Sequence, residues 1–138
     1  MNLDFEAVRI AQEIIKQTSE EIIPVKNGNR KPSKNEVENL VTKSLGVLQE
    51  NGVYACMLYL YSRTSVADKA VGKKTSKLLL ELIENIGKKP SSDSATNDDI
   101  LLFLTDEICT DLDTLLFVKQ LWEQTLTYAR YGAKARAE

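Results

Sequence analysis

The sequence predicts an all-α fold, a single-domain bundle of about six helices with short connections. Apolar residues recur at helical spacing in most segments, capping and turn residues separate these segments, and no segment has the alternating pattern of a strand. The chain has 138 residues, of which 43% are hydrophobic, so it is long enough for one core. We therefore expect one helical domain over residues 1–138.

The first predicted helix is followed by a basic loop. An apolar stripe that includes Phe5, Val8 and Ile22 predicts a helix over residues 3–23. The next segment, 24–32, contains two prolines, an Asn-Gly pair and three basic residues, and it has no acid. This composition is typical of a surface loop with a turn at its tip.

Capping and turn residues mark the next two helices. Ser33 and Glu36 have the spacing of a capping box, which predicts that a second helix starts here and runs to about residue 50. Gly52 is expected to adopt a left-handed backbone conformation and end this helix. The short segment 53–62 is apolar on most sides, so we expect a helix that is buried at the centre of the bundle.

A fourth helix is predicted over residues 66–86. Ser65 and Asp68 form a second capping pattern at its start. Gly87 follows its last apolar residue and is well placed as its C-terminal cap. We expect Val66 to belong to the inner face of this helix.

The last third of the chain is expected to contain a mobile loop, two helices and a frayed tail. Residues 90–97 are small and polar, which is typical of a mobile loop. Helical spacing then predicts a short helix over 97–108 and a long one over 111–131. From Gly132 onward the tail, 132–138, is expected to fray. Most acids of this third stand at predicted helix starts, where the helix dipole stabilises them, so they do not indicate a metal site.

The residue types that usually perform catalysis are missing or scattered. The chain has no histidine, which excludes Ser-His and Cys-His nucleophile pairs and most catalytic zinc sites. It has neither a phosphate-binding glycine loop nor a calcium loop. A net charge of −2 excludes a strongly basic nucleic-acid binder but allows a local basic face. We therefore expect a protein that is not an enzyme, with no catalytic residue, no metal and no cofactor.

Cysteine usage and hydropathy predict a cytoplasmic protein. Cys56 and Cys109 lie far apart in apolar helical segments, which predicts buried free thiols in a reducing compartment. No apolar run reaches about 18 residues, the length of a membrane span. The first residues include acids and lack a basic region, so we expect no secretory signal.

The basic residues with the clearest pattern lie on the fourth predicted helix. Lys69, Lys73 and Lys77 recur every four positions and therefore form one stripe, called the lysine stripe below, with Lys74 beside it. Such a stripe is suited to contacts with phosphates, which need point charges and no sequence code. The same pattern is also typical of a solvated helix face, and the sequence leaves both interpretations open.

A second group of basic residues stands near the C-terminus. Arg130, Lys134 and Arg136, called the C-terminal cluster below, are further candidates for RNA contact. Their alternative role is to complement the helix dipole and to keep the tail solvated. Tyr128 and Tyr131 in the same region fit a place in the core and a place in an interface equally well.

The order of these segments resembles a known family. Residues 45–60, LGVLQENGVYACMLYL, have an apolar helix end, an Asn-Gly turn and a short apolar helix. Residues 112–131, LDTLLFVKQLWEQTLTYARY, have a late helix with a Leu-Trp pair followed by small and basic residues. With the helix between them, these segments resemble the small helical subunit of the type III-B CRISPR effector, the fifth subunit of the Cmr complex.

The resemblance implies a structural role in antiviral defence. Members of this family are not enzymes. Their copies stack head-to-tail beside the backbone subunits and line the groove in which target RNA pairs with guide RNA. Their contacts are to the RNA backbone and to duplex shape, while base pairing reads the sequence. The implied partners are other subunits of the complex, neighbouring copies, guide RNA and target RNA, and no membrane.

Two other interpretations remain open from the sequence. The small subunit of a type III-A CRISPR complex is also short and helical. A helical protein–protein adaptor without an RNA role would need none of the basic residues named above. The family supplies no invariant catalytic residue to carry over, so the predicted RNA-binding residues rest on charge placement alone.

Overall fold

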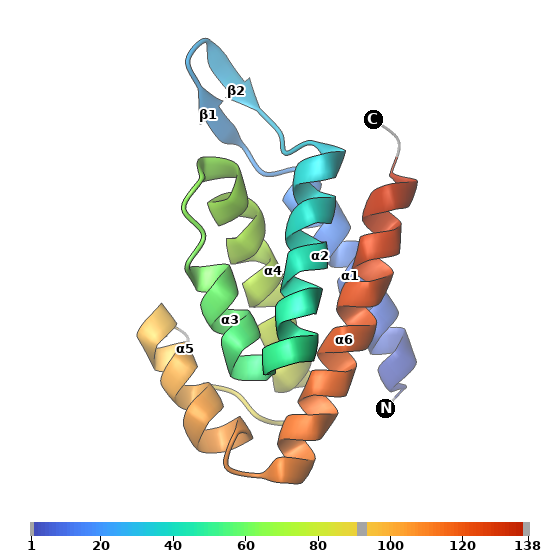
Figure 1. Ribbon diagram of the computed structural model, residues 1–138, viewed down its shortest axis with the longest axis vertical. Coiled ribbons are helices and arrows are strands. Elements are labelled where there is room, and N and C mark those ends of the chain that lie inside the picture. The colour runs from blue at the N-terminus through green and yellow to red at the C-terminus, as the bar shows by residue number, and fades with distance from the viewer. Residues whose placement is uncertain (1, 91–93, 137–138) are drawn as a thin grey trace.

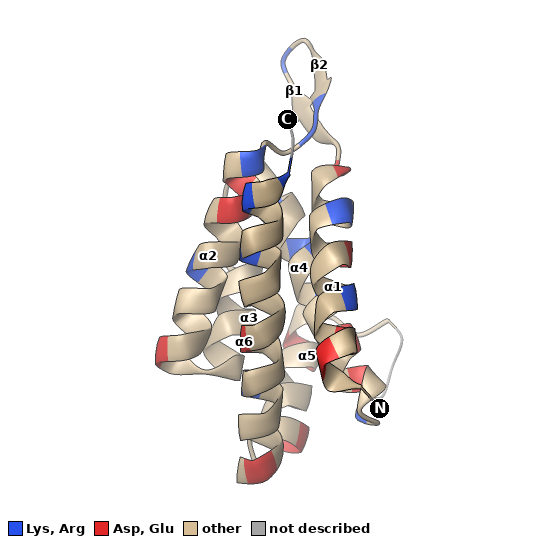
Figure 2. Ribbon diagram, turned by 90° about the vertical axis from the view of Figure 1, so that its right-hand side faces the viewer, with Lys and Arg blue, Asp and Glu red and all other residues tan. Residues whose placement is uncertain are grey.

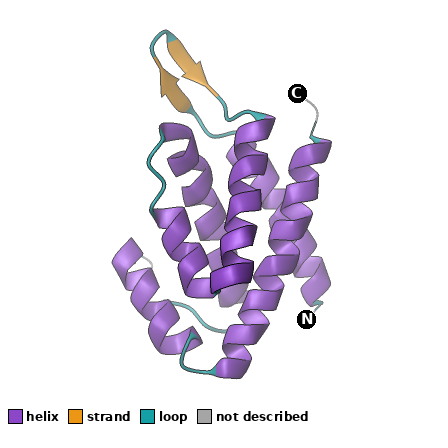
Figure 3. Ribbon diagram, viewed as in Figure 1, coloured by secondary structure: helices purple, strands orange, loops and turns teal. Residues whose placement is uncertain are grey.

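The computed structural model describes residues 2–90 and 94–136 (Figure 1). The described residues form an elongated helical bundle with one short β-hairpin at its end, and helices account for nearly all of the regular structure (Figure 3). This confirms the predicted all-α fold. The elements are α1 (Leu3–Ser19), β1 (Ile23–Val25), β2 (Gly28–Arg30), α2 (Lys34–Asn51), α3 (Val53–Tyr61), α4 (Val66–Asn85), α5 (Asn97–Phe103), the π-helical turn η1 (Leu104–Ile108) and α6 (Leu112–Ala135).

Four long helices form the bundle, and two short helices lie outside it. α6 packs along both α1 and α2, α4 packs against α1, and α3 packs against α2 and α4. The core lies between these helices and includes Trp122, whose side chain is fully buried. The indole Nε1–H of Trp122 donates a hydrogen bond of 3.0 Å to the carbonyl oxygen of Leu79, which ties α6 to α4. The polar atom of the largest buried side chain is therefore satisfied.

The predicted helix boundaries are confirmed where capping residues set them. Ser33 and Glu36 form both hydrogen bonds of a capping box at the start of α2. The hydroxyl of Ser65 accepts a hydrogen bond from the backbone N–H of Asp68 at the start of α4. Gly52 has a φ of +95°, a conformation that only glycine adopts without strain. The chain therefore turns at this residue from α2 into α3.

The segment 24–32, predicted to be a loop, belongs to a β-hairpin. The prediction that the chain has no strand is therefore wrong. α1 ends at Ser19, and β1 then pairs with β2 in antiparallel register, with Ile23 opposite Arg30. Pro24 disfavours helix for the residue before it, so the chain cannot stay helical up to Ile23. Ile23 packs into the core, whereas Ile22 is 56% exposed. Each strand has only three residues, too few for an alternating pattern to be visible in the sequence.

The prediction that the short apolar helix is buried at the centre of the bundle is wrong. α3 lies at the side of the bundle, between α2 and α5 in the view of Figure 1. Its inner side contributes Met57 and Leu60 to the core, whereas Tyr54 is 39% exposed and Leu58 is 45% exposed. Because only one side of α3 meets α2 and α4, its apolar outer side stays in contact with solvent.

Two predicted inner faces differ from the structure by a small rotation. Phe5 in α1 and Val66 in α4 were expected to be buried but are 59% and 57% exposed. In α4 the neighbouring residues Ala67 and Val71 face the core instead. At the ends of helices the periodic pattern is short, and it then fixes the buried face less well.

The predicted mobile loop and frayed tail are shorter than expected. Thr96 caps α5 through a capping box, so residues 96 and 97 belong to a helix start. Residues 91–93 of the predicted loop lie outside the described residues. α6 continues to Ala135. Ala133 is fully buried, so this last part of the helix packs against the rest of the bundle. Residues 137–138 of the predicted tail also lie outside the described residues.

Candidate nucleic-acid interface

The lysine stripe lies on the outer side of α4, and all three of its side chains are exposed. Within the described part of the chain, none of the three forms an ion pair or a side-chain hydrogen bond. Lys74, also named as a candidate, is turned toward the hairpin side, where its Nζ lies 3.8 Å from Oε1 of Glu21. Three unpaired cations are therefore presented in one row, about 6 Å apart along the helix.

The lysine stripe forms one wall of a groove, called the α4 groove below, with a volume of about 830 Å³. The end of α3 and the start of α5 supply the other wall, and their contribution includes Tyr61 and Ile100. The charged residues that line the groove are five basic and two acidic ones: Arg63, Lys69, Lys73, Lys77 and Lys89, and Glu81 and Glu84. The α4 groove therefore attracts anions at its stripe end, where none of the described lining residues is acidic.

The walls of the groove also supply an apolar surface. Leu60, Leu80 and Ile100 line the groove together with the ring of Tyr61. Burial raises the pKa of Tyr61 to about 12, so its hydroxyl stays neutral at physiological pH. The groove thus combines a cationic rim with an apolar and aromatic lining.

Arg63 is a lining residue that the sequence analysis missed. Its Nε donates a hydrogen bond of 2.9 Å to the carbonyl oxygen of Tyr59, and its guanidinium lies 3.7 Å from the centre of the Tyr59 ring. Nη2 donates a further hydrogen bond of 3.2 Å to Oγ of Ser62. These contacts hold Arg63 at the groove although it lies in a connection. No helical pattern includes it, so the sequence offers no signal beyond its charge.

Gly72 sets the distance between the two walls. A Cβ atom at this position would lie only 3.1 Å from the carbonyl oxygen of Leu60 and 3.4 Å from Cγ of Arg63. The last turn of α3 therefore approaches the backbone of α4 more closely than a larger residue would permit. This contact positions Tyr61 and Arg63 relative to the lysine stripe.

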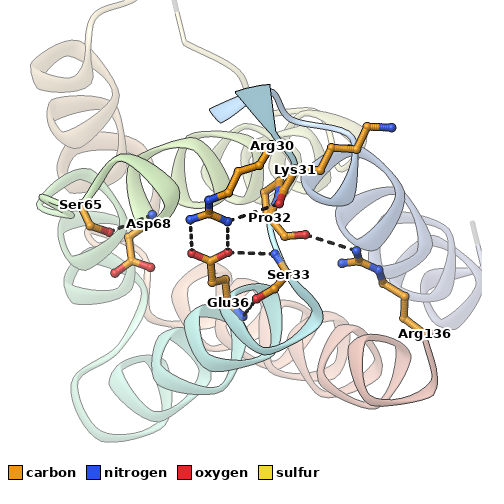
Figure 4. A network of polar contacts seen from close by, with 8 residues as sticks. All are labelled: Arg30, Lys31, Pro32, Ser33, Glu36, Ser65, Asp68 and Arg136. Atoms are coloured by element: carbon orange, nitrogen blue, oxygen red, sulfur yellow. Dashed lines mark hydrogen bonds and ion pairs between the residues drawn. The ribbon is translucent and has the colours of Figure 1, made fainter. Parts of the chain in front are cut away.

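The C-terminal cluster does not line the α4 groove. Nζ of Lys134 lies 3.8 Å from Oε1 of Glu38, and Nη2 of Arg136 donates a hydrogen bond of 3.2 Å to the carbonyl oxygen of Pro32 (Figure 4). Nε of Arg130 is shielded from solvent and has no hydrogen-bond partner among the described residues. The predicted RNA-binding residues therefore lie at two separate sites. At the second site, Lys134 and Arg136 already have partners within the protein.

The hairpin is anchored to α2 by an ion pair near this cluster (Figure 4). The guanidinium of Arg30 donates two hydrogen bonds to the carboxylate of Glu36, with lengths of 2.6 and 2.9 Å. The backbone N–H of Ser33 donates to the same carboxylate. These contacts, led by the hydrogen bonds from Arg30, lower the pKa of Glu36 to about 2. The charge of Arg30 is thus largely neutralised by Glu36.

Charge is distributed unevenly along the long axis (Figure 2). The hairpin end carries Lys26, Arg30 and Lys31, and the end of α6 adds Lys134 in its last turn and Arg136 at its cap. At the opposite end, the first turns of α5, η1 and α6 are acidic. Glu36 and Glu38 neutralise Arg30 and Lys134 at the hairpin end, so the excess of positive charge there is concentrated in the hairpin, and the opposite end is acidic.

A second, smaller groove separates α1 from α6 and has a volume of about 440 Å³. Val8 and Ile15 line it on α1, and Tyr128 and Gly132 line it on α6. Tyr131, also on α6, is 61% exposed. The exposure of both tyrosines favours the interface interpretation over the core interpretation.

The described residues were also compared with the requirements of a metal site, a reactive thiol and a membrane span. No group of three or more acidic or cysteine side chains in the described ranges is arranged to hold a metal ion. Both cysteines are free; Cys56 is buried as predicted, whereas Cys109 is partly exposed. Burial raises the pKa of Cys56 to about 12, which makes its thiol unreactive. Among the helices that the structure describes, none has the length and apolar character needed to cross a bilayer.

Comparison of the chain with protein-family models, with curated proteins and with solved structures finds no match. The resemblance to the CRISPR small subunit therefore rests on the sequence segments quoted above and stays a prediction.

Proposed function

We propose that the protein is a non-catalytic small subunit of a type III-B CRISPR effector ribonucleoprotein and that its lysine stripe contacts the RNA backbone. The observation that carries the proposal is the row of three exposed lysines on α4 that form no ion pair with any other described residue. The complex acts in antiviral defence in the cytoplasm, and its partners are the other subunits, neighbouring copies, guide RNA and target RNA.

The spacing of the lysine stripe supports contact with a phosphate backbone. Four residues of helix advance by about 6 Å, a distance similar to that between successive phosphates of an RNA strand. Lysines act as point charges and therefore bind phosphates without reading sequence. Base pairing between guide and target supplies the sequence specificity in such a complex.

The uneven charge of the two ends supports head-to-tail stacking of copies. A basic hairpin end that meets the acidic end of a neighbouring copy would form a contact between opposite charges (Figure 2). Such contacts are weak in an isolated pair because water and salt screen them. We therefore expect stacking to become firm only in the assembled complex.

One observation favours a second candidate function, that of a helical protein–protein adaptor. The groove between α1 and α6 is mostly apolar, and Tyr128, which lines it, is 39% exposed. Exposed apolar surface of this kind marks protein contacts. The small subunit of a type III-A complex is a further alternative, which the identity of the partner subunits distinguishes.

The experiment that tests the proposal is a pull-down of the tagged protein from its own cells. Sequencing of the co-purified RNA should find guide RNAs with repeat-derived tags, and mass spectrometry should find the backbone subunits of a type III-B complex. Type III-A subunits in their place would support the first alternative. Recovery of protein partners without RNA would leave the adaptor and exclude the RNA-contacting subunit.

A further inference from the structure

We propose that the α4 groove binds an unpaired stretch of single-stranded RNA, with a base against Tyr61 and the neighbouring phosphates on the lysine stripe. This inference rests on the proposed function and narrows it, because it names the form of RNA that the lysines meet. The charge pattern does not distinguish a single strand from a duplex at this site, and the family resemblance implies contacts to duplex shape, so an unpaired segment goes beyond both.

The shape of the groove favours a single strand. In an A-form duplex the bases are stacked and paired, so that only the backbone and the groove edges reach a protein surface. A duplex would contact the rim formed by the lysine stripe and would leave the apolar lining empty. The volume of about 830 Å³ lies within the range of about 300–1,000 Å³ in which proteins bind small ligands, which is enough for an unstacked nucleotide.

The lining offers what an unpaired base needs. Proteins that bind single strands combine a positively charged groove with aromatic side chains on which bases stack. Here Tyr61 comes from the end of α3, and the lysine stripe comes from α4. Leu80, which is half-buried, adds apolar surface beside Tyr61, whereas Ile100 is only 6% exposed and adds little. The combination arises only in the folded chain, because the aromatic ring and the cations are not interleaved in the sequence.

The charges of the groove set the path of the strand. The lysine stripe and Arg63 lie toward the start of α4, whereas Glu81 and Glu84 line the groove closer to the end of this helix. Glu81 is partly neutralised by Arg9, whose Nη2 lies 3.6 Å from it. Lys89 lines the groove at the same end and offsets part of the remaining negative charge. Phosphates are therefore attracted most strongly at the stripe end, which favours a short unpaired segment there.

The test measures binding of the full chain to a short fluorescein-labelled oligouridylate by fluorescence anisotropy at low salt. Three further probes are compared with it: an RNA of the same length without bases, a blunt RNA duplex of the same length, and unlabelled polyglutamate as competitor. We expect the oligouridylate to bind at least about fivefold more tightly than the abasic RNA, since stacking of one base on an aromatic ring has an effect of this size. The duplex should bind more weakly than the single strand.

Two substitutions at Tyr61 separate stacking from folding. Tyr61→Leu keeps the apolar volume but removes the ring, and it should weaken binding of the oligouridylate about fivefold or more. Tyr61→Phe keeps the ring and should stay within about twofold of the natural protein. Binding of the abasic RNA should be the same in both variants, and thermal melting shows whether each variant is folded.

The triple change of the lysine stripe to glutamate distinguishes this inference from the proposed function. Suppose that the triple change abolishes binding, that Tyr61→Leu binds the oligouridylate as tightly as the natural protein does, and that the abasic RNA binds as tightly as the oligouridylate. The base contact is then refuted and the backbone contact stands. Equal affinity for the duplex and the single strand also refutes the inference. If the triple change does not weaken RNA binding, both proposals fail. If polyglutamate displaces the RNA as well as unlabelled oligouridylate does, the groove is a site for acidic peptides and the inference is overturned.

Discussion

The two basic regions of this protein have similar composition but different surroundings. The lysine stripe on α4 projects into a groove and has no anionic partner among the described residues. Two members of the C-terminal cluster and one residue of the hairpin next to it have partners within the protein: Glu38 pairs with Lys134, Glu36 pairs with Arg30, and the backbone of Pro32 accepts from Arg136. The first region is available to an external anion, whereas the second mainly fastens the hairpin and the end of α6.

The difference shows that a cluster of cations is not in itself a binding site. An arginine that already donates to a carboxylate has lost much of its attraction for a phosphate, because a new partner must displace the old one. An exposed lysine without a partner has no such cost, and it releases counterions when it meets a phosphate. Tertiary contacts determine which cations are free. They therefore determine which of the two regions can bind a phosphate from outside the protein.

The largest effect should come from the lysine stripe itself. Replacement of all three lysines by glutamate should weaken RNA binding at least tenfold and should reduce the salt dependence of the binding constant. Each phosphate contact on a single strand contributes about 0.7 to the slope of log K against log salt, so the slope should fall by about 2. Titrations at several salt concentrations measure both quantities.

A matched triple change controls for net charge. Lys16, Lys26 and Lys43 are exposed residues of α1, the hairpin turn and α2 outside the α4 groove, and their replacement by glutamate changes the charge by the same amount. We expect this variant to retain most of its affinity. An equal loss in both variants would show that RNA responds to overall charge, and the distinction drawn between the two regions would then be wrong.

The next largest effect should follow from a change at Gly72. Gly72→Ala places a methyl group 3.1 Å from the carbonyl oxygen of Leu60, so the backbones of α3 and α4 must separate by a few tenths of an ångström. We expect the free energy of unfolding to fall by about 1 kcal/mol or more and RNA binding to weaken, because Tyr61 and Arg63 move with α3. Denaturant unfolding and anisotropy measure the two effects.

Gly46→Ala is the matched control for this change. Gly46 lies within α2, and no atom is close to the place where its Cβ would stand. Alanine is the better helix former, so this variant should gain about 0.5–1 kcal/mol. A gain of the same size in Gly72→Ala would mean that α3 has room to shift, and the close contact would not matter for the groove.

A smaller effect is expected at the anchor of the hairpin. Glu36→Gln removes the charge that Arg30 binds and should lower the free energy of unfolding by about 1 kcal/mol at neutral pH. Because folding lowers the pKa of Glu36 from 4.5 to about 2, this stabilisation is complete above about pH 4.5 and is lost as the pH falls toward 2. Unfolding curves of both proteins between pH 2 and 7 should converge at the acidic end. Affinity for RNA should be unchanged.

The smallest effect should come from Lys134→Gln. Its ion pair with Glu38 is long, at 3.8 Å, and nearly half of the Lys134 side chain is exposed. Such pairs contribute between zero and about 0.5 kcal/mol, so thermal melting should hardly change. RNA affinity should also be unchanged. A loss as large as that of a single lysine of the stripe would place the C-terminal cluster in the RNA contact after all.

The fold was predictable where single residues force the backbone or satisfy a helix end. Ser33 and Glu36 place the start of α2, and Gly52 places its end, because these effects depend on a few neighbouring residues. The hairpin was missed because its pairing is tertiary information carried by only six strand residues. The outer side of α3 was misjudged because apolar composition does not tell on which sides a short helix meets its neighbours.

The candidate site was predictable only in part for a related reason. The lysine stripe follows from the spacing of four residues on one helix, which the sequence displays directly. Tyr61 and Arg63 join it through the packing of α3 on α4, a contact that depends on the missing side chain of Gly72. The partners of Lys134 and Arg136 are also distant in the sequence. A count of charges along the sequence therefore cannot distinguish the C-terminal cluster from the lysine stripe.

The burial of Trp122 has a practical consequence. It is the only tryptophan of the chain, its ring is enclosed by the core, and its N–H is held by the carbonyl of Leu79. Its fluorescence therefore reports on the contact between α6 and α4 without any attached dye. The emission should shift to longer wavelength as this contact opens to water. The spectrum of each variant thus shows directly whether a lost affinity reflects a lost contact with RNA or a loosened bundle.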